Sequence, residues 1–156
     1  PCGFYPDLSR CHCSYTAVRR YQEKISMPLL DRMDMMIEVS ALSYPQWNQK
    51  TQEMSSTQMK KKVERVREIQ KERRKGQSFL FNSRMGNQEL EEYCALGTQE
   101  KKLMKKAFDE LKISARGYTK ILKVARTIAD LEEKEQIQTE HLQEALCYRI
   151  GNGIYR

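Results

Sequence analysis

Long apolar runs and the commonest catalytic motifs are both missing from this sequence. No stretch approaches the roughly 20 apolar residues of a membrane-spanning helix, and the start does not resemble a secretory signal. There is no G-x-x-x-x-G-K-[ST] phosphate loop and no acidic strand suited to magnesium. His12 and His141 are the two histidines, and neither completes a Ser/His/Asp or Cys/His set. We therefore expect a cytoplasmic protein that has no membrane partner and no self-contained catalytic site.

The composition is polar and moderately basic. Hydrophobic residues make up 39% and charged residues 31%, which favours helices with wide solvated faces or a surface that meets a partner. The 28 Lys and Arg against 21 Asp and Glu give a charge of +7, compatible with nucleic acid, nucleotide phosphates or an acidic protein. Five unevenly spread cysteines argue against a secreted disulfide framework. Because the first residue is proline, we expect a piece of a longer protein.

The clearest helix lies at residues 114–131. Its apolar residues recur at helical spacing and form one stripe, and Ser114 is a good N-cap. Arg116 falls in the first turn, off the stripe, where the helix dipole disfavours a cation by about 0.3–1 kcal/mol. This placement indicates either a nearby anion or a tolerated solvent-exposed arginine. Arg126, on the flank of the same helix, is interpreted as a structural ion-pair former, and His141 as a surface residue.

The rest of the chain reads as mainly α. A short helix is predicted over residues 14–24, a turn over 29–34, a buried strand over 35–39, and a long charged helix over 57–75. From Asn87, which we expect to be an N-cap, four short helices form a small bundle, with Thr98 and Thr139 capping two of them. Since no other convincing strand exists, residues 1 to about 55 should be disordered or rearranged without the rest of a sheet.

Two groups of residues suggest binding sites. Cys2, Cys11 and Cys13 are spaced for a soft-metal site such as Zn²⁺, or are three reduced thiols in a flexible loop. The long helix carries basic residues, of which we single out Lys60, Lys61, Lys62, Arg73 and Arg74 as a nucleic-acid contact. The alternative is a solvated face on which Glu64, Glu68 and Glu72 pair with the cations, since no interleaved aromatics are present to stack on bases.

Three stretches carry a resemblance to a known family. They are S-A-R-G-Y-T-K-I-L-K-V-A-R-T-I-A-D-L at residues 114–131, I-Q-T-E-H-L-Q-E-A-L-C-Y-R at 137–149, and S-M-P-L-L-D-R-M-D at 26–34. Together they resemble the C-terminal portion of the magnesium-chelatase-like AAA+ ATPases, in the bacterial branch associated with competence. Met27 stands where family members carry glycine, and the family's cysteine pattern implies a further cysteine before Pro1. The least similar parts are 40–86 and 151–156.

The resemblance implies a role for two arginines. Arg32 would be an arginine finger presented to the nucleotide of the adjacent subunit, and Arg116 would be sensor 2, reaching the ATP of its own subunit. Without the family, Asp31, Arg32 and Asp34 would be a turn with a local ion pair. ATP and Mg²⁺ are then cofactors of the full-length protein, Zn²⁺ is a candidate at the cysteine loop, and no tightly bound cofactor is expected for these 156 residues alone.

We therefore expect four segments. Residues 1–44 are the end of the α/β core with the cysteine loop and the arginine-finger turn, 45–86 a linker and long basic helix, 87–150 the helical lid, and 151–156 a tail. The implied partners are the upstream ATPase core, identical subunits in a hexameric ring, and DNA. The alternatives are a non-enzymatic basic helical module that binds nucleic acid, or an adaptor that binds a protein partner regardless of nucleotide.

Overall fold

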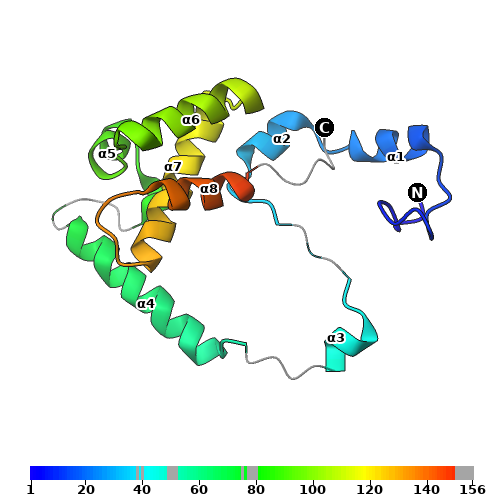
Figure 1. Cartoon of the computed structure of the whole chain (residues 1–156), viewed down its shortest axis with the longest axis horizontal. Coiled ribbons are helices and arrows are strands. Elements are labelled where there is room, and N and C mark those ends of the chain that lie inside the picture. Colours follow the sequence, from blue (N-terminus) through cyan, green and yellow to red (C-terminus); the bar gives the residue numbers. More distant parts are fainter. Residues whose placement is uncertain (38, 40, 49–52, 75, 77–80, 150–156) are drawn as a thin grey trace.

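The computed structural model describes residues 1–37, 39, 41–48, 53–74, 76 and 81–149. These residues form helices and contain no strand, so the prediction of a mainly α protein is confirmed. In chain order the elements are α1 (Tyr15–Gln22), α2 (Met27–Arg32), α3 (Tyr44–Asn48), α4 (Ser56–Arg73), the 3-10 turn η1 (Asn82–Arg84), α5 (Asn87–Tyr93), α6 (Thr98–Leu111), α7 (Ala115–Leu131) and α8 (Thr139–Cys147) (Figure 1).

Helix α7 is the centre of the fold. It contacts α8, α4, α5, α2 and η1, and α6 packs on α8 (Figure 1). Its predicted stripe is buried: Ile121, Leu122 and Ala125 are at most 6% exposed. Arg126 and Asp130 are also buried, on a second face that the apolar pattern did not reveal. The helix that the sequence predicted most clearly therefore organises the bundle.

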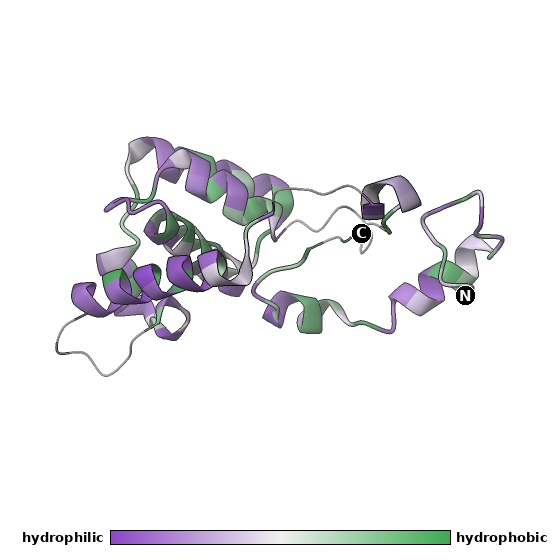
Figure 2. Ribbon diagram, turned by 90° about the horizontal axis from the view of Figure 1, so that it is seen from below, coloured by the Kyte–Doolittle hydropathy of each residue, from purple (hydrophilic) through white to green (hydrophobic). Residues whose placement is uncertain are grey.

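The bundle core comes from α5 to α8 and the turn before α5. Met104, Leu142 and Ala145 are fully enclosed together with α7, and Met85 and Leu90 close the side nearest α5. Hydrophilic and hydrophobic residues alternate along these helices, as expected for amphipathic segments (Figure 2). The same view shows α1 and the N-terminal loop at the end of the molecule away from the bundle. The predicted four-helix bundle is confirmed.

Helix starts follow the predicted capping chemistry with shifts of one residue. The Ser114 hydroxyl accepts a hydrogen bond from the Gly117 N–H at 2.9 Å, and Ser14 caps α1 in the same way. By contrast, Asn87, Thr98 and Thr139 are first helical residues, and the N-caps are Gly86, Gly97 and Gln138. The three predicted caps were one residue late. At two of these helix starts a side chain three residues on accepts from the N-cap amide: Glu89 from the Gly86 N–H at 2.8 Å, and His141 from the Gln138 N–H at 2.9 Å.

The N-terminal segment differs most from the prediction. Most of the predicted turn at 29–34 is part of helix α2, with Pro28 in its first turn, because proline fits the first helical positions. Residues 35–37 and 39 do not form the predicted strand, and 38 lies outside the described residues. A strand needs neighbours for its N–H and C=O groups. Here Met36 N–H donates to the Tyr148 carbonyl at 2.8 Å, and Ile37 and Val39 are 68% and 86% exposed.

The long basic helix is confirmed as α4, but only its second half packs on the bundle. Val66, Gln70 and Arg74, spaced by four, are buried against it. Met59 and Val63 are about half exposed, and residues 56–65 are all exposed. Figure 1 shows the N-terminal end of α4 pointing away from α7.

Candidate functional site

Helix α2 is fastened to the start of α7 through Asp31. The Asp31 Oδ1 atom accepts from the Ser114 hydroxyl at 2.9 Å and from the Arg149 guanidinium at 2.5 Å. Its Oδ2 atom lies 3.6 Å from the Arg116 guanidinium. Three segments that are far apart in sequence therefore meet at one carboxylate, at the N-terminus of α7.

Arg149 holds the same, C-terminal end of α2. Its guanidinium donates to the carbonyls of Asp31 at 3.0 Å, Leu30 at 3.4 Å and Met33, so it caps the C-terminus of the helix. A cation is favourable there because the last carbonyls of a helix carry partial negative charge. Gly117 gives it room: a Cβ at this position would lie 3.4 Å from an Arg149 nitrogen and 3.1 Å from Ile113. The sequence alone assigned no role to Arg149, although it ends the matching stretch at 137–149.

The two predicted arginines lie at this junction. Arg32, the last residue of α2, is exposed, and its guanidinium makes no ion pair with the part of the chain that the structure describes. Arg116 keeps 58% of its side chain exposed despite the contact with Asp31. Lys120, one turn beyond Arg116, donates to the Arg32 carbonyl and pairs with Asp34 at 2.8 Å. The face of α7 that carries Arg116 is therefore the face against which the end of α2 lies.

Replacing Arg149 with methionine is expected to release α2 while leaving the bundle folded. The substitution keeps an unbranched side chain but removes the donors that cap α2 and pair with Asp31. Hydrogen exchange should show faster exchange of the amides in residues 27–36 and unchanged protection in α7 and α8. Arg149→Lys keeps the charge but loses the planar guanidinium. Amide protection of residues 27–36 in this variant should therefore be intermediate between that of the parent and that of Arg149→Met. Equal protection of residues 27–36 in Arg149→Met and the parent chain would contradict this account.

The five predicted nucleic-acid residues divide into two groups. Lys60, Lys61 and Lys62 are exposed in the first half of α4, and Lys60 lies 3.8 Å from Glu64. Arg73 turns inward to Asp130, and Arg74 is 2% exposed, donates to the Asn82 side chain at 2.5 Å and lies over the Tyr93 ring. The lysines remain accessible to a partner, whereas the two arginines are part of the interior.

A buried polar network surrounds Asp130. The carboxylate is fully buried and accepts from Arg126 at 3.0 Å, from Asn82 at 2.9 Å, from Gln70 at 3.1 Å and from Arg73. Arg126 also donates to the carbonyls of Lys134 and Glu135. Burial lowers the pKa of both Arg126 and Arg74 from the usual value. The prediction that Arg126 is a structural ion-pair former is confirmed.

His141 is not the surface residue that the sequence predicted. It is 1% exposed, and its Nδ1 accepts from the Gln138 N–H at 2.9 Å, which caps α8. Its Nε2 lies 3.1 Å from the Glu132 carboxylate, so the proton belongs on Nε2. The available sequence signal was its position three residues after the N-cap, where a side chain can reach back to the N-cap amide.

The predicted cysteine group is brought together. The Sγ atoms of Cys2, Cys11 and Cys13 all lie within 4.8 Å of one another, and the three thiols are free. The Cys2 N–H donates to the Cys13 Sγ at 3.2 Å. A backbone hydrogen bond at Phe4, helped by the Cys13 and Cys11 thiols, lowers the pKa of the Cys2 thiol to about 7. His12 is not part of this group.

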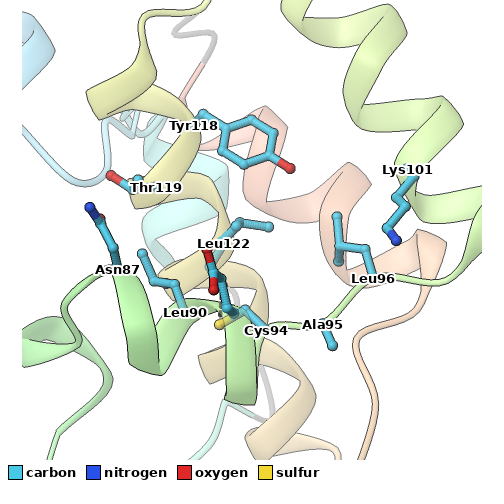
Figure 3. A pocket seen from close by; sticks show the side chains of 10 residues that line it. Asn87, Leu90, Cys94, Ala95, Leu96, Lys101, Tyr118, Thr119 and Leu122 are labelled. Carbon is cyan, nitrogen blue, oxygen red and sulfur yellow. Dashed lines mark hydrogen bonds between the residues drawn. The ribbon is translucent and has the colours of Figure 1, made fainter.

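A pocket of about 420 Å³ lies on another side of α7, between α5, the segment that follows α5, and α6 (Figure 3). Leu90, Leu122 and Tyr118 line it, with Lys101 and Thr119 at its polar parts. Burial raises the pKa of Cys94, which also lines it, to about 11, so this thiol is unreactive. None of the predicted site residues lines this pocket.

Comparison with known proteins identifies the class of this helical domain. The family described as "Magnesium chelatase, subunit ChlI C-terminal" matches residues 53–149, and "Magnesium chelatase, subunit ChlI" matches residues 1–47. Taken together with the bundle and the three stretches that carried the resemblance, these matches show the family. The chain belongs to the magnesium-chelatase-like AAA+ ATPases.

Two curated relatives narrow the branch. The chain is 42% identical over 152 residues to the competence protein ComM of Haemophilus influenzae, covering 96% of this chain and 28% of ComM. It is 34% identical over 150 residues to the uncharacterized protein YifB of Salmonella typhimurium, covering 96% of this chain and 29% of YifB. The chain thus spans less than a third of the length of these relatives. No helix among the described residues is long and apolar enough to cross a bilayer.

Proposed function

We propose that this chain supplies the helical lid and two nucleotide-facing arginines of an AAA+ ATPase ring that acts on DNA. In this proposal Arg32 and Arg116 approach the triphosphate bound by the neighbouring subunit, and the phosphate loop that holds this triphosphate belongs to the remaining protein. The subunits form a hexamer, and ATP and Mg²⁺ bind to the core outside these 156 residues. The relative named for competence agrees with a role in handling DNA.

The contact between α2 and the start of α7 carries the proposal. Asp31 and Lys120 fasten the end of α2 to the face of α7 that bears Arg116. Any phosphate that Arg32 reaches therefore lies on the same side of the lid as Arg116. This favours one shared nucleotide over the arrangement that the resemblance implies, in which Arg116 meets the ATP of its own subunit.

The chemistry suits two guanidinium groups. Phosphoryl transfer spreads negative charge over the γ-phosphate oxygens, and a planar guanidinium can donate two parallel hydrogen bonds to them. Arg116 gives up only a 3.6 Å contact with Asp31 when it turns to a phosphate, because Asp31 keeps its closer partners Arg149 and Ser114. The first turn of α7 adds favourable positive potential for an anion.

ATP turnover by the full-length protein tests this proposal. Arg32→Ala and Arg116→Ala should each reduce turnover by about 10³-fold or more. If both variants retain turnover, the lid does not serve a nucleotide and the assignment of these arginines fails.

A second candidate function is DNA binding by the free half of α4, favoured by the exposure of three consecutive lysines. Lys60, Lys61 and Lys62 stand clear of the bundle, on a segment in which every residue from 56 to 65 is exposed. Replacing all three with glutamine should weaken DNA binding and lower the slope of log K against log salt by up to about 3, since each phosphate contact contributes about 0.9.

Three lysines on α6 provide the matched control. Lys101, Lys102 and Lys105 are also exposed or half-exposed, and the same replacement removes the same net charge. The control triple variant should leave the salt slope within about one unit of the parent value. Equal loss of slope in the two triple variants would show a response to net charge alone and would contradict the assignment to α4.

A further inference from the structure

We infer that residues 2–13 form a thiolate metal site that takes Zn²⁺ through Cys2, Cys11 and Cys13. This inference does not depend on the proposed ATPase function, because the loop lies apart from the junction of α2 and α7 (Figure 1). The Sγ atoms lie within 4.8 Å of one another without any disulfide. No other group of three His, Cys, Asp or Glu side chains among the described residues has such geometry.

The spacing is close to that of a filled site. Zn–S bonds of about 2.3 Å in a tetrahedron place the sulfur atoms about 3.8 Å apart. A contraction of at most about 1 Å from the 4.8 Å limit would therefore bring the three sulfurs around one ion. Side-chain rotation alone can supply such a shift, because Cys2 is exposed and Cys13 is only half-buried.

Local hydrogen bonds shape the loop for this purpose. Asp7 accepts from the Ser9 N–H at 3.0 Å, the Ser9 hydroxyl at 2.5 Å and the Arg10 guanidinium at 2.6 Å, which closes a turn midway between Cys2 and Cys11. The Cys2 N–H donates to the Cys13 Sγ, as donors around a coordinated thiolate do. The turn and this bond bring both ends of the loop to the same place.

No apolar core explains the meeting of the three cysteines. Phe4, Tyr5 and Leu8 are 46%, 43% and 76% exposed, yet Cys11 is only 8% exposed. A loop of this size gains little from burying surface, and small units of this kind commonly depend on a metal or disulfides. An odd set of three thiols suits metal coordination better than disulfide pairing.

Among the described residues, no fourth His, Cys, Asp or Glu side chain joins the three thiols. His12 stands between two of the ligands in sequence but outside the thiol group. Binding replaces the thiol protons, so Zn²⁺ uptake should release protons to the solvent as the three thiolates form. These residues thus supply three thiolates to the site.

Titration of the whole chain with Co²⁺ under a phosphine reductant tests the site. One equivalent should produce thiolate-to-cobalt charge-transfer absorption and the visible bands of tetrahedral Co²⁺, and one equivalent of Zn²⁺ should abolish them. Cys11→Ser and Cys13→Ser should each weaken Zn²⁺ binding at least about 100-fold, since even partners outside the coordination sphere contribute 10–100-fold. Cys147→Ser, at an exposed cysteine on α8, is the matched control and should bind like the parent.

Three results would overturn the inference. The first is the absence of thiolate charge transfer at saturating Co²⁺, and the second is an unchanged spectrum in Cys11→Ser and Cys13→Ser. The third is a loss of Zn²⁺ binding in His12→Ala that is as complete as in the cysteine variants. His12 would then be a metal ligand, and the proposed set of three thiolates would be wrong. Circular dichroism of each variant should match the parent, because the bundle of α5 to α8 does not include this loop.

Discussion

Asp130→Ala is expected to destabilise the fold by at least about 3–5 kcal/mol, because it leaves buried guanidinium groups without their counter-charge. Asp130 is fully buried and is the acceptor shared by Arg126, Arg73, Gln70 and Asn82. A domain of this size commonly has only 5–15 kcal/mol of stability. The variant should therefore be close to unfolding at room temperature.

Urea unfolding followed by circular dichroism measures this loss. Asp130→Asn, which keeps the shape and removes the charge, should also be strongly destabilised. The matched control is Glu133→Gln, which breaks the exposed pair with Arg65 at 2.9 Å and should cost no more than about 1 kcal/mol. Labelling of Cys94, which is 3% exposed in the fold, gives an independent readout of opening. If the free energy of unfolding of Asp130→Asn is within about 1 kcal/mol of the parent value, the network around Asp130 does not stabilise the fold as proposed.

Under the proposed function, Arg32→Ala or Arg116→Ala in the full-length protein is expected to reduce ATP turnover by about 10³-fold or more. Arginine fingers contribute 10³–10⁵ in well-studied phosphoryl transfers, which corresponds to about 4–7 kcal/mol of barrier. Both side chains are exposed and held on one side of the lid by the contacts of Asp31 and Lys120. Lysine at either position should recover little, because it keeps the charge but loses the two parallel donors.

Arg84→Ala is the matched control for these variants. Arg84 is an exposed arginine on η1, away from the contact between α2 and α7, so its loss should leave turnover within a few-fold of the parent. The expected effect of Arg32→Ala or Arg116→Ala is wrong if either variant retains turnover comparable with that of Arg84→Ala.

The helices of the bundle could be predicted because their signals are local. The stripe of α7 and the Ser114 cap lie within one continuous segment, and the structure confirms both. The sequence pattern of α4 predicted where this helix lies in the chain but not which of its residues are buried. Arg73 and Arg74 were interpreted as surface cations, because the sequence does not show that Asp130 and Asn82 lie beside them in the fold. These partners lie 57 and 8 residues away, and periodicity contains no information about them.

The junction of α2 and α7 could be predicted only in part. The resemblance pointed to Arg32 and Arg116, but Asp31 lies 83 residues from Ser114 and 118 from Arg149 in sequence. The strand expected at 35–39 was wrong because a short apolar run has no intrinsic preference without neighbouring strands. Long-range contacts therefore decided both the site and the main error.

The most direct test of the shared-nucleotide proposal is a mixing experiment with two variant forms of the full-length protein, each expected to lack ATP turnover. One form carries Arg116→Ala with an intact phosphate loop, and the other carries intact Arg116 with its phosphate loop disabled. If Arg116 serves the nucleotide of the neighbouring subunit, mixing equal amounts should restore turnover at about a quarter of the subunit interfaces, because an intact phosphate loop then meets an intact Arg116 at about one interface in four. If Arg116 serves only the nucleotide of its own subunit, no nucleotide site combines an intact phosphate loop with an intact Arg116. The mixture would then remain as inactive as either form alone.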